Sequence, residues 1–185
     1  MRIALLGGSF NPPHVAHQMI CLWVLSTEQA DQLWLMPCYH HPFGKELVDF
    51  GHRVEMCQLA SAIFPPGRVS VCTIESELGG EGRTLFTLQA LRERHPEHSW
   101  RLVIGADILQ EASAWYRFDE VQRLAPPLVL GRTGYPSPEG APVLPQISST
   151  RIREALRRGE DPVAWVPAAV RAYVQQHQLY SGHAG

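Results

Sequence analysis

The chain has 185 residues, of which 45% are hydrophobic and 18% are charged, with a formal net charge of −2 at pH 7. This composition suits one compact domain with a buried core, and without a basic excess we expect no nucleic-acid partner. No apolar run approaches the roughly 20 residues that span a bilayer, so we expect no membrane partner. The four cysteines are scattered without a Cys-x-x-Cys pair, which favours reduced thiols and a cytoplasmic location.

Short apolar segments alternate along the chain with longer segments of helical period. Near-continuous apolar runs predict buried parallel strands at 2–6, 32–36, 68–73, 101–104 and 128–131. The segments between them predict helices over 15–29, 52–64, 84–95 and 119–124. Such alternation is typical of α/β proteins with a doubly wound parallel sheet, and we predict a Rossmann-like fold.

The last third of the chain differs in composition. Residues 135–142 hold three prolines and one glycine, which predicts a loop. Two helices follow, one that begins near Ser148 and one near Pro167, where a proline suits the first helical turn. We expect a single domain over residues 1–185, with a core at 1–133, a linker at 134–146 and a C-terminal helical extension at 147–185.

The loop after the first predicted strand is the first candidate site, because ligands of such sheets bind beyond the carboxyl ends of the strands. It reads Gly7-Gly8-Ser9-Phe10-Asn11-Pro12-Pro13-His14-Val15-Ala16-His17. The two glycines let the backbone approach a ligand, and a helix that begins near His14 offers unpaired N–H groups to a phosphate. His14 and His17 lie on the same side of the first helical turn. From the residues alone, this pair could also be half of a metal site or two capping side chains without a chemical role.

This loop resembles the signature of the HxGH-type nucleotidyltransferase superfamily. The segment Ile147-Ser148-Ser149-Thr150-Arg151-Ile152-Arg153 is similar to the second signature of that superfamily, ISSTxIR. Alone, the second segment could be an ordinary capped helix with a solvated basic face; both motifs in the right order favour the resemblance. The resemblance implies that ATP is bound by Gly7, Gly8, Ser9, Phe10, Ser148, Ser149 and Thr150. It implies that the transfer itself depends on His14, His17, Lys45 and Arg153.

Further segments narrow the resemblance to the nicotinate/nicotinamide mononucleotide adenylyltransferases, over nearly the whole chain. The family has a strand-end motif that the segment Ile104-Gly105-Ala106-Asp107 matches, followed by a tryptophan that Trp115 matches. Residues 84–88 are similar to its TxxTL segment, and residues 53–60 are similar to its RxxMxxLA helix. The resemblance implies that Gly105 and Asp107 contact the nucleotide. It implies that the acceptor is bound by Asn11, Arg83, Thr84 and Trp115. From the residues alone, Trp115 could be a core side chain and Asp107 a helix cap.

The sequence departs from the family pattern at several places. Asn11 stands where aspartate is common and Ala16 where the HxGH glycine stands, while His41-Pro42-Phe43-Gly44-Lys45 replaces a PPHK run. Gly82-Arg83-Thr84 replaces Ser-Tyr-Thr, and Arg83 could pair with an acceptor carboxylate or be a solvated loop residue. The resemblance implies transfer of AMP from ATP to nicotinate mononucleotide in NAD biosynthesis, with nicotinamide mononucleotide open as a second acceptor.

Mg²⁺ is the cofactor that the resemblance implies. We expect it to arrive with ATP and to keep phosphate and water ligands, so that no protein metal ligands are needed. Three alternatives remain open: a different phosphate acceptor, a nucleotide sensor without turnover, and a metal-binding α/β protein. The sequence also leaves the oligomeric state open, including a homo-oligomer.

Overall fold

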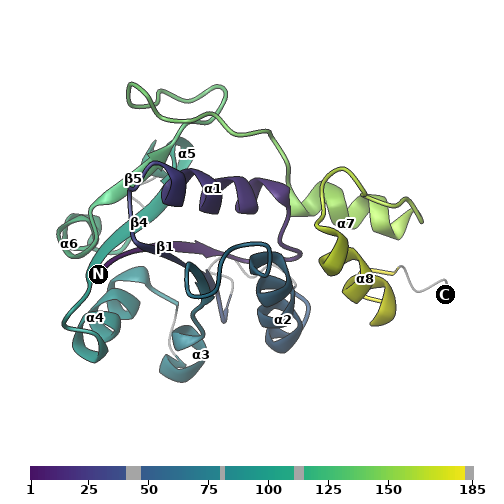
Figure 1. Cartoon of the computed structure of the whole chain (residues 1–185), viewed down its shortest axis with the longest axis horizontal. Helices are drawn as coiled ribbons and strands as arrows, with labels where there is room; N and C mark the ends of the chain where they lie inside the picture. The colour runs from purple at the N-terminus through teal and green to yellow at the C-terminus, as the bar shows by residue number, and fades with distance from the viewer. Residues whose placement is uncertain (41–46, 80–81, 111–114, 182–185) are drawn as a thin grey trace.

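The computed structural model describes residues 1–40, 47–79, 82–110 and 115–181. Within them the chain forms a five-stranded parallel sheet in the order β3-β2-β1-β4-β5 (Figure 1). The strands are β1 (Arg2–Gly8), β2 (Gln32–Pro37), β3 (Val69–Val71), β4 (Ser99–Gly105) and β5 (Pro127–Leu130). The strand order reverses between β1 and β4, which creates a crevice beyond their carboxyl ends. The predicted doubly wound, Rossmann-like fold is confirmed.

The helices connect these strands or follow them. They are α1 (Val15–Ser26), α2 (Phe50–Ser61), α3 (Ile74–Leu78), α4 (Thr84–Arg94), α5 (Ala106–Gln110), α6 (Phe118–Leu124), α7 (Ser149–Arg157) and α8 (Ala168–Gln176). Among the described residues, none of these helices has the length and apolar character that a bilayer span requires. All four cysteines are free thiols, as expected.

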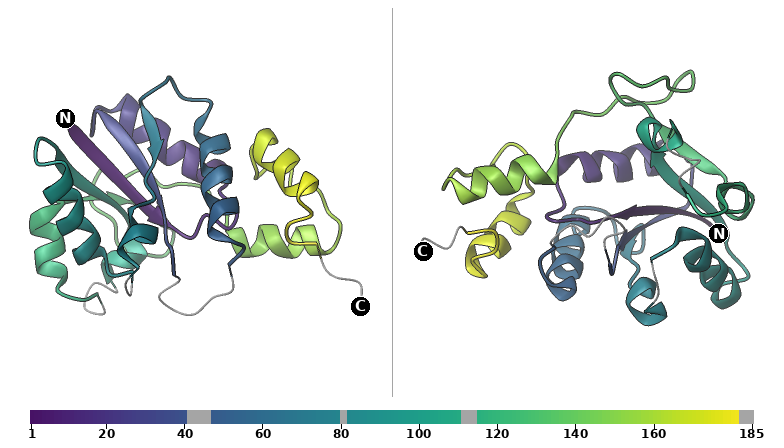
Figure 2. Two further views of the ribbon diagram at one scale, coloured as in Figure 1. Left: turned by 90° about the horizontal axis from the view of Figure 1, so that it is seen from below. Right: turned by 180° about the vertical axis from the view of Figure 1, so that it is seen from behind.

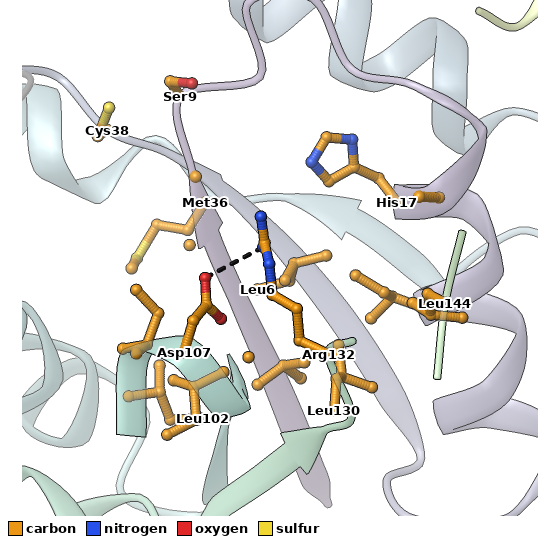
Figure 3. A pocket seen from close by; sticks show the side chains of 18 of the residues that line it. Leu6, Ser9, His17, Met36, Cys38, Leu102, Asp107, Leu130, Arg132 and Leu144 are labelled. Atoms are coloured by element: carbon orange, nitrogen blue, oxygen red, sulfur yellow. Dashed lines mark ion pairs between the residues drawn. The ribbon is translucent and has the colours of Figure 1, made fainter. Parts of the chain in front are cut away.

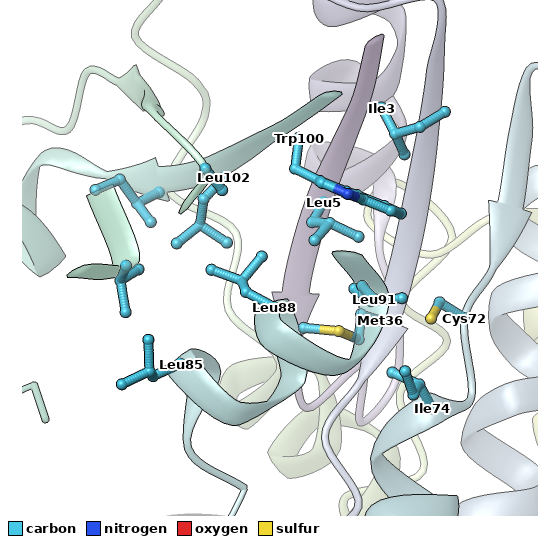
Figure 4. Close-up of a cluster of buried hydrophobic side chains, with 13 residues drawn as sticks. Ile3, Leu5, Met36, Cys72, Ile74, Leu85, Leu88, Leu91, Trp100 and Leu102 are labelled. Atoms are coloured by element: carbon cyan, nitrogen blue, oxygen red, sulfur yellow. The ribbon is translucent and has the colours of Figure 1, made fainter. Parts of the chain in front are cut away.

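The central strand β1 places side chains alternately on both faces of the sheet. On one face, Ile3 and Leu5 pack in a cluster with Leu85, Leu88 and Leu91 of α4 (Figure 4). On the other face, Ala4 and Leu6 pack with residues of α1 and α2. Burial on both faces explains why the strands are nearly continuous in apolar residues.

A third cluster attaches the C-terminal helices to α2. Ile152 of α7 and Val170 of α8 are fully buried against Met56 of α2. Figures 1 and 2 show α7 and α8 together beside α2, at one end of the sheet. This docking brings a segment from the end of the chain next to the loop that follows β1.

The observed boundaries differ from the predicted ones for local reasons. The first strand continues to Gly8 because Gly7 and Gly8 pair with Met36 and Pro37 of β2. Helix α2 begins two residues early, at Phe50, because the Asp49 carboxylate accepts the N–H of Gly51 at 2.8 Å and caps the helix. The short helices α3 and α5 were not predicted, since five residues are too few to establish a periodic pattern.

Candidate active site

A cavity of about 1530 Å³ lies at the carboxyl ends of β1 and β4, where the strand order reverses (Figure 3). The ends of both strands, the first turn of α1 and the first turn of α7 contribute to its wall. The predicted site residues that line it are Gly7, Gly8, Ser9, His14, His17, Arg83, Thr84, Gly105, Asp107, Trp115 and Ser148. The fold therefore brings most of the predicted site to one place.

The two histidines form a stacked pair at the start of α1. His14 is the N-cap residue, and its backbone N–H donates to Nδ1 of His17 at 3.0 Å. The centroids of the two imidazole rings are 3.8 Å apart. The ring of Phe10 packs against that of His17, with 4.8 Å between their centroids. Because Nδ1 of His17 accepts a hydrogen bond, its neutral ring carries the proton on Nε2, which leaves one N–H donor.

Burial sets the charge of this pair. It lowers the pKa of His14 to about 4. It also lowers the pKa of His17 well below the usual range, and the neighbouring His14 lowers it further. Without a bound ligand both rings are therefore neutral at pH 7, and each neutral ring has one N–H group that can donate to an anion.

The start of α7 lies against the loop that follows β1. The Ser149 hydroxyl donates to the carbonyl oxygen of Pro12 at 2.9 Å, and Nη1 of Arg153 donates to that of Asn11 at 2.8 Å. Ser148 caps α7 by accepting the N–H of Arg151 at 3.2 Å, and both residues line the cavity. The two sequence motifs, more than 130 residues apart, thus meet at one cavity.

Some predicted residues lie behind the cavity wall. Phe10, Asn11, Ser149, Thr150 and Arg153 are not among the lining residues. The buried Asn11 side chain accepts from the Tyr180 hydroxyl at 2.8 Å, so it links the first loop to the C-terminal segment. Lys45 lies outside the described residues.

An ion pair crosses the cavity near the end of β4. Oδ2 of Asp107 lies 3.1 Å from Nη1 of Arg132, which follows β5 (Figure 3). A Cβ on Gly105 would come within 2.3 Å of Oδ1 of Asp107, so the glycine leaves room for this carboxylate. Sequence reasoning missed Arg132; its place directly after a strand end was the available signal.

Another part of the cavity wall combines a cation with aromatic rings. Arg83 is the N-cap residue of α4, and its Cζ lies 4.4 Å from the ring centroid of Tyr116. Trp115 packs edge-on against Phe118 and also lines the cavity. Tyr116 was not predicted, although it directly follows the predicted Trp115. Stacking surfaces beside a fixed positive charge suit an aromatic ligand that carries a carboxylate.

Comparison with known proteins agrees with this arrangement. A family model described as cytidylyltransferase-like matches residues 5–155. Two relatives named "Probable nicotinate-nucleotide adenylyltransferase" are similar over 97% of the chain: one from Anaeromyxobacter dehalogenans (strain 2CP-C), 52% identical over 97% of its own length, and one from Myxococcus xanthus (strain DK1622), 46% identical over 95%. A solved structure of Plasmodium falciparum nicotinic acid mononucleotide adenylyltransferase complexed with NaAD has a TM-score of 0.80 at 18% identity, covering 97% of each chain.

The cavity at the strand-order reversal and the matched family model together define a nucleotidyltransferase of the cytidylyltransferase-like class. The full-length relatives narrow the class further. The chain belongs to the nicotinate-nucleotide adenylyltransferase family.

Proposed function

We propose that this protein transfers AMP from ATP to nicotinate mononucleotide and releases pyrophosphate, as a step of NAD biosynthesis. The observation that carries the proposal is the meeting of the His14–His17 turn and the Ser148 turn at one cavity. Each turn begins a helix and offers hydrogen-bond donors, so together they suit a single triphosphate.

In the proposed reaction, an oxygen of the acceptor's 5′-phosphate attacks the α-phosphorus of ATP in line. The new bond joins that oxygen to the α-phosphorus, and the bond from the α-phosphorus to the oxygen bridging to the β-phosphate breaks. The bridging oxygen leaves with pyrophosphate. The phosphate nucleophile is already an anion at neutral pH, so the protein contributes positioning and charge stabilisation rather than a strong base.

The residues divide this work by their positions. His14 and His17 donate to the triphosphate, with His17 at the α-phosphate, and Ser148 and Arg151 face the β- and γ-phosphates. Ser149 and Arg153 also hold loop carbonyl oxygens, and the phosphate contact that the motif implies for them stays a prediction.

Mg²⁺ fits this site as an ion that arrives with ATP. The described carboxylates on the cavity wall are already engaged: Asp107 pairs with Arg132, and Glu75 accepts the N–H of Tyr39 at 3.1 Å. Burial also raises the pKa of Glu75, which makes it a poorer ligand for a hard cation. The bound ion would neutralise phosphate charge while it keeps water and phosphate ligands.

The proposal is tested by pyrophosphate release from MgATP with each candidate acceptor supplied separately. We expect turnover with nicotinate mononucleotide and a lower kcat/KM with nicotinamide mononucleotide. Binding of ATP without pyrophosphate release for any acceptor would instead indicate a nucleotide sensor.

Arg83 gives the proposed acceptor preference a physical basis, because a guanidinium can pair with the pyridine carboxylate but not with the neutral amide. We expect Arg83→Gln to lower kcat/KM for nicotinate mononucleotide by roughly 10- to 100-fold, from charged hydrogen bonds of about 1.5–3 kcal/mol. The value for nicotinamide mononucleotide should change little. Steady-state kinetics with both acceptors check this, with Arg92→Gln on the exposed face of α4 as the matched control. Equal losses for both acceptors would contradict the assignment.

A further inference from the structure

A second group of chemically reactive side chains lies at the opposite end of β4 from the cavity. It occupies the turn between α4 and β4, where His95 ends α4 and the N–H of His98 donates to the carbonyl oxygen of His95 at 3.1 Å. Strand β4 runs from Ser99 to Gly105, so the turn is about 20 Å from the cavity end of the strand at ~3.3 Å per residue. This group therefore lies outside the proposed catalytic site.

Three ligand atoms converge in this turn. Oε1 of Glu97 lies 3.3 Å from Nε2 of His98 and 3.8 Å from Nδ1 of His95, and all three atoms lie within 4.8 Å of one another. The two imidazole rings are nearly parallel, with an interplanar angle of 6° and centroids 5.6 Å apart. One carboxylate oxygen thus lies within 4 Å of a nitrogen of each imidazole.

Two tryptophans hold the histidines in place. Trp34 of β2 packs edge-on against both rings, at centroid distances of 5.5 Å to His95 and 6.3 Å to His98. Trp100, which is 3% exposed, contacts both rings as well, at 6.2 and 5.9 Å. The ring orientations are therefore largely set before any ligand binds, which lowers the entropy cost of binding.

We propose that His95, Glu97 and His98 bind a transition-metal dication, with Zn²⁺ as the best match. Two imidazole nitrogens and one carboxylate oxygen are a set that Zn²⁺ accepts, with water in the remaining position. Zn²⁺ bonds of about 2.0–2.1 Å place tetrahedral ligand atoms roughly 3.4 Å apart. The two separations between Glu97 and the histidines, 3.8 and 3.3 Å, are already close to this value, and the 61% exposed Glu97 side chain can adjust them. The two histidine nitrogens lie within 4.8 Å of each other, so the rings themselves must also move slightly closer together.

The same geometry limits the affinity. A metal on Nε2 of His98 leaves the ring proton on Nδ1, which is buried with no hydrogen-bond partner among the described residues. Histidine ligands usually donate that proton to an acceptor, and loss of such a partner typically weakens metal binding about 10- to 100-fold. We therefore expect a Zn²⁺ affinity in the micromolar range and a stabilising role for the turn, not a catalytic one.

The test is calorimetric titration of the full chain with Zn²⁺, compared with His95→Gln and Glu97→Gln. Each substitution should weaken this site at least tenfold, whereas substitution of the exposed C-cap residue of α8, His177→Gln, should leave it unchanged. Cu²⁺ should quench the fluorescence of Trp34 and Trp100 in the unsubstituted chain and much less in the two variants. Turnover of Glu97→Gln should equal that of the unsubstituted chain, which shows that the variant is folded.

Two results would overturn the proposal. One is the absence of Zn²⁺ binding to the unsubstituted chain at micromolar concentrations. The other is binding of equal affinity and stoichiometry in His95→Gln and Glu97→Gln, which would place the ion elsewhere, for example at His14 and His17.

Discussion

Replacing His17 with alanine should lower kcat by about 100- to 1000-fold, the loss typical of removing one preorganised donor to a developing negative charge. The ring is neutral, carries its proton on Nε2 and lines the cavity (Figure 3). Its N–H is therefore placed to stabilise charge at the α-phosphate, and alanine removes this donor altogether.

The substitution also has a structural cost, which must be measured separately. Nδ1 of His17 accepts the backbone N–H of His14, so alanine removes a cap worth about 1 kcal/mol. Thermal unfolding should show this small loss, and single-turnover kinetics should show the much larger loss in the chemical step.

Two companion variants sharpen the result. His17→Asn keeps a short donor and should retain more activity than alanine, while His177→Ala, which is not among the residues that line the cavity, should retain normal turnover. Near-normal turnover of His17→Ala would remove His17 from the mechanism.

The sequence predicted the sheet and the first motif well because both depend on local signals. Apolar runs identify strands that are buried on both faces, and Gly7 and Gly8 after such a run identify the loop at the strand end. The helix that follows begins where predicted, with His14 as its N-cap.

Contacts between distant segments were harder to predict. The motif predicts phosphate binding by Arg153, but it gives no sign that the guanidinium also donates to the carbonyl oxygen of Asn11. Arg132 was not singled out because its partner, Asp107, lies on a neighbouring strand end. The residues around Lys45 lie outside the described structure, so its role remains a prediction.

Arg53 is the clearest case of a residue whose importance only the fold reveals. In the sequence it is only the first residue of the helix pattern at 53–60, yet in the folded protein it is 1% exposed. Its guanidinium donates to four backbone carbonyl oxygens: Ser9, Cys38, Tyr39 and Val48, at 3.1, 2.7, 3.5 and 3.1 Å respectively. It therefore ties the loop after β1 and the loop after β2 to α2.

Replacing Arg53 with methionine should destabilise the protein by roughly 3–5 kcal/mol, because the apolar side chain fills the space but leaves buried carbonyl acceptors unpaired. At about 2–4 °C per kcal/mol for a chain of this size, the midpoint of thermal unfolding should fall by roughly 6–20 °C. Arg92→Met, on the exposed face of α4, should change stability by no more than about 0.5 kcal/mol.

The loss should extend to substrate binding, since Ser9 and Cys38 both line the cavity. We expect KM for ATP to rise in Arg53→Met even at temperatures where the variant remains folded, as checked by circular dichroism. Arg53→Lys should have a KM for ATP between those of the unsubstituted chain and Arg53→Met. Its ammonium keeps the charge but cannot reach four carbonyl oxygens at once. An Arg53→Met protein with unchanged stability and unchanged KM would show that the two loops hold their positions without the guanidinium, and the packing of α2 alone would then have to explain the shape of the cavity.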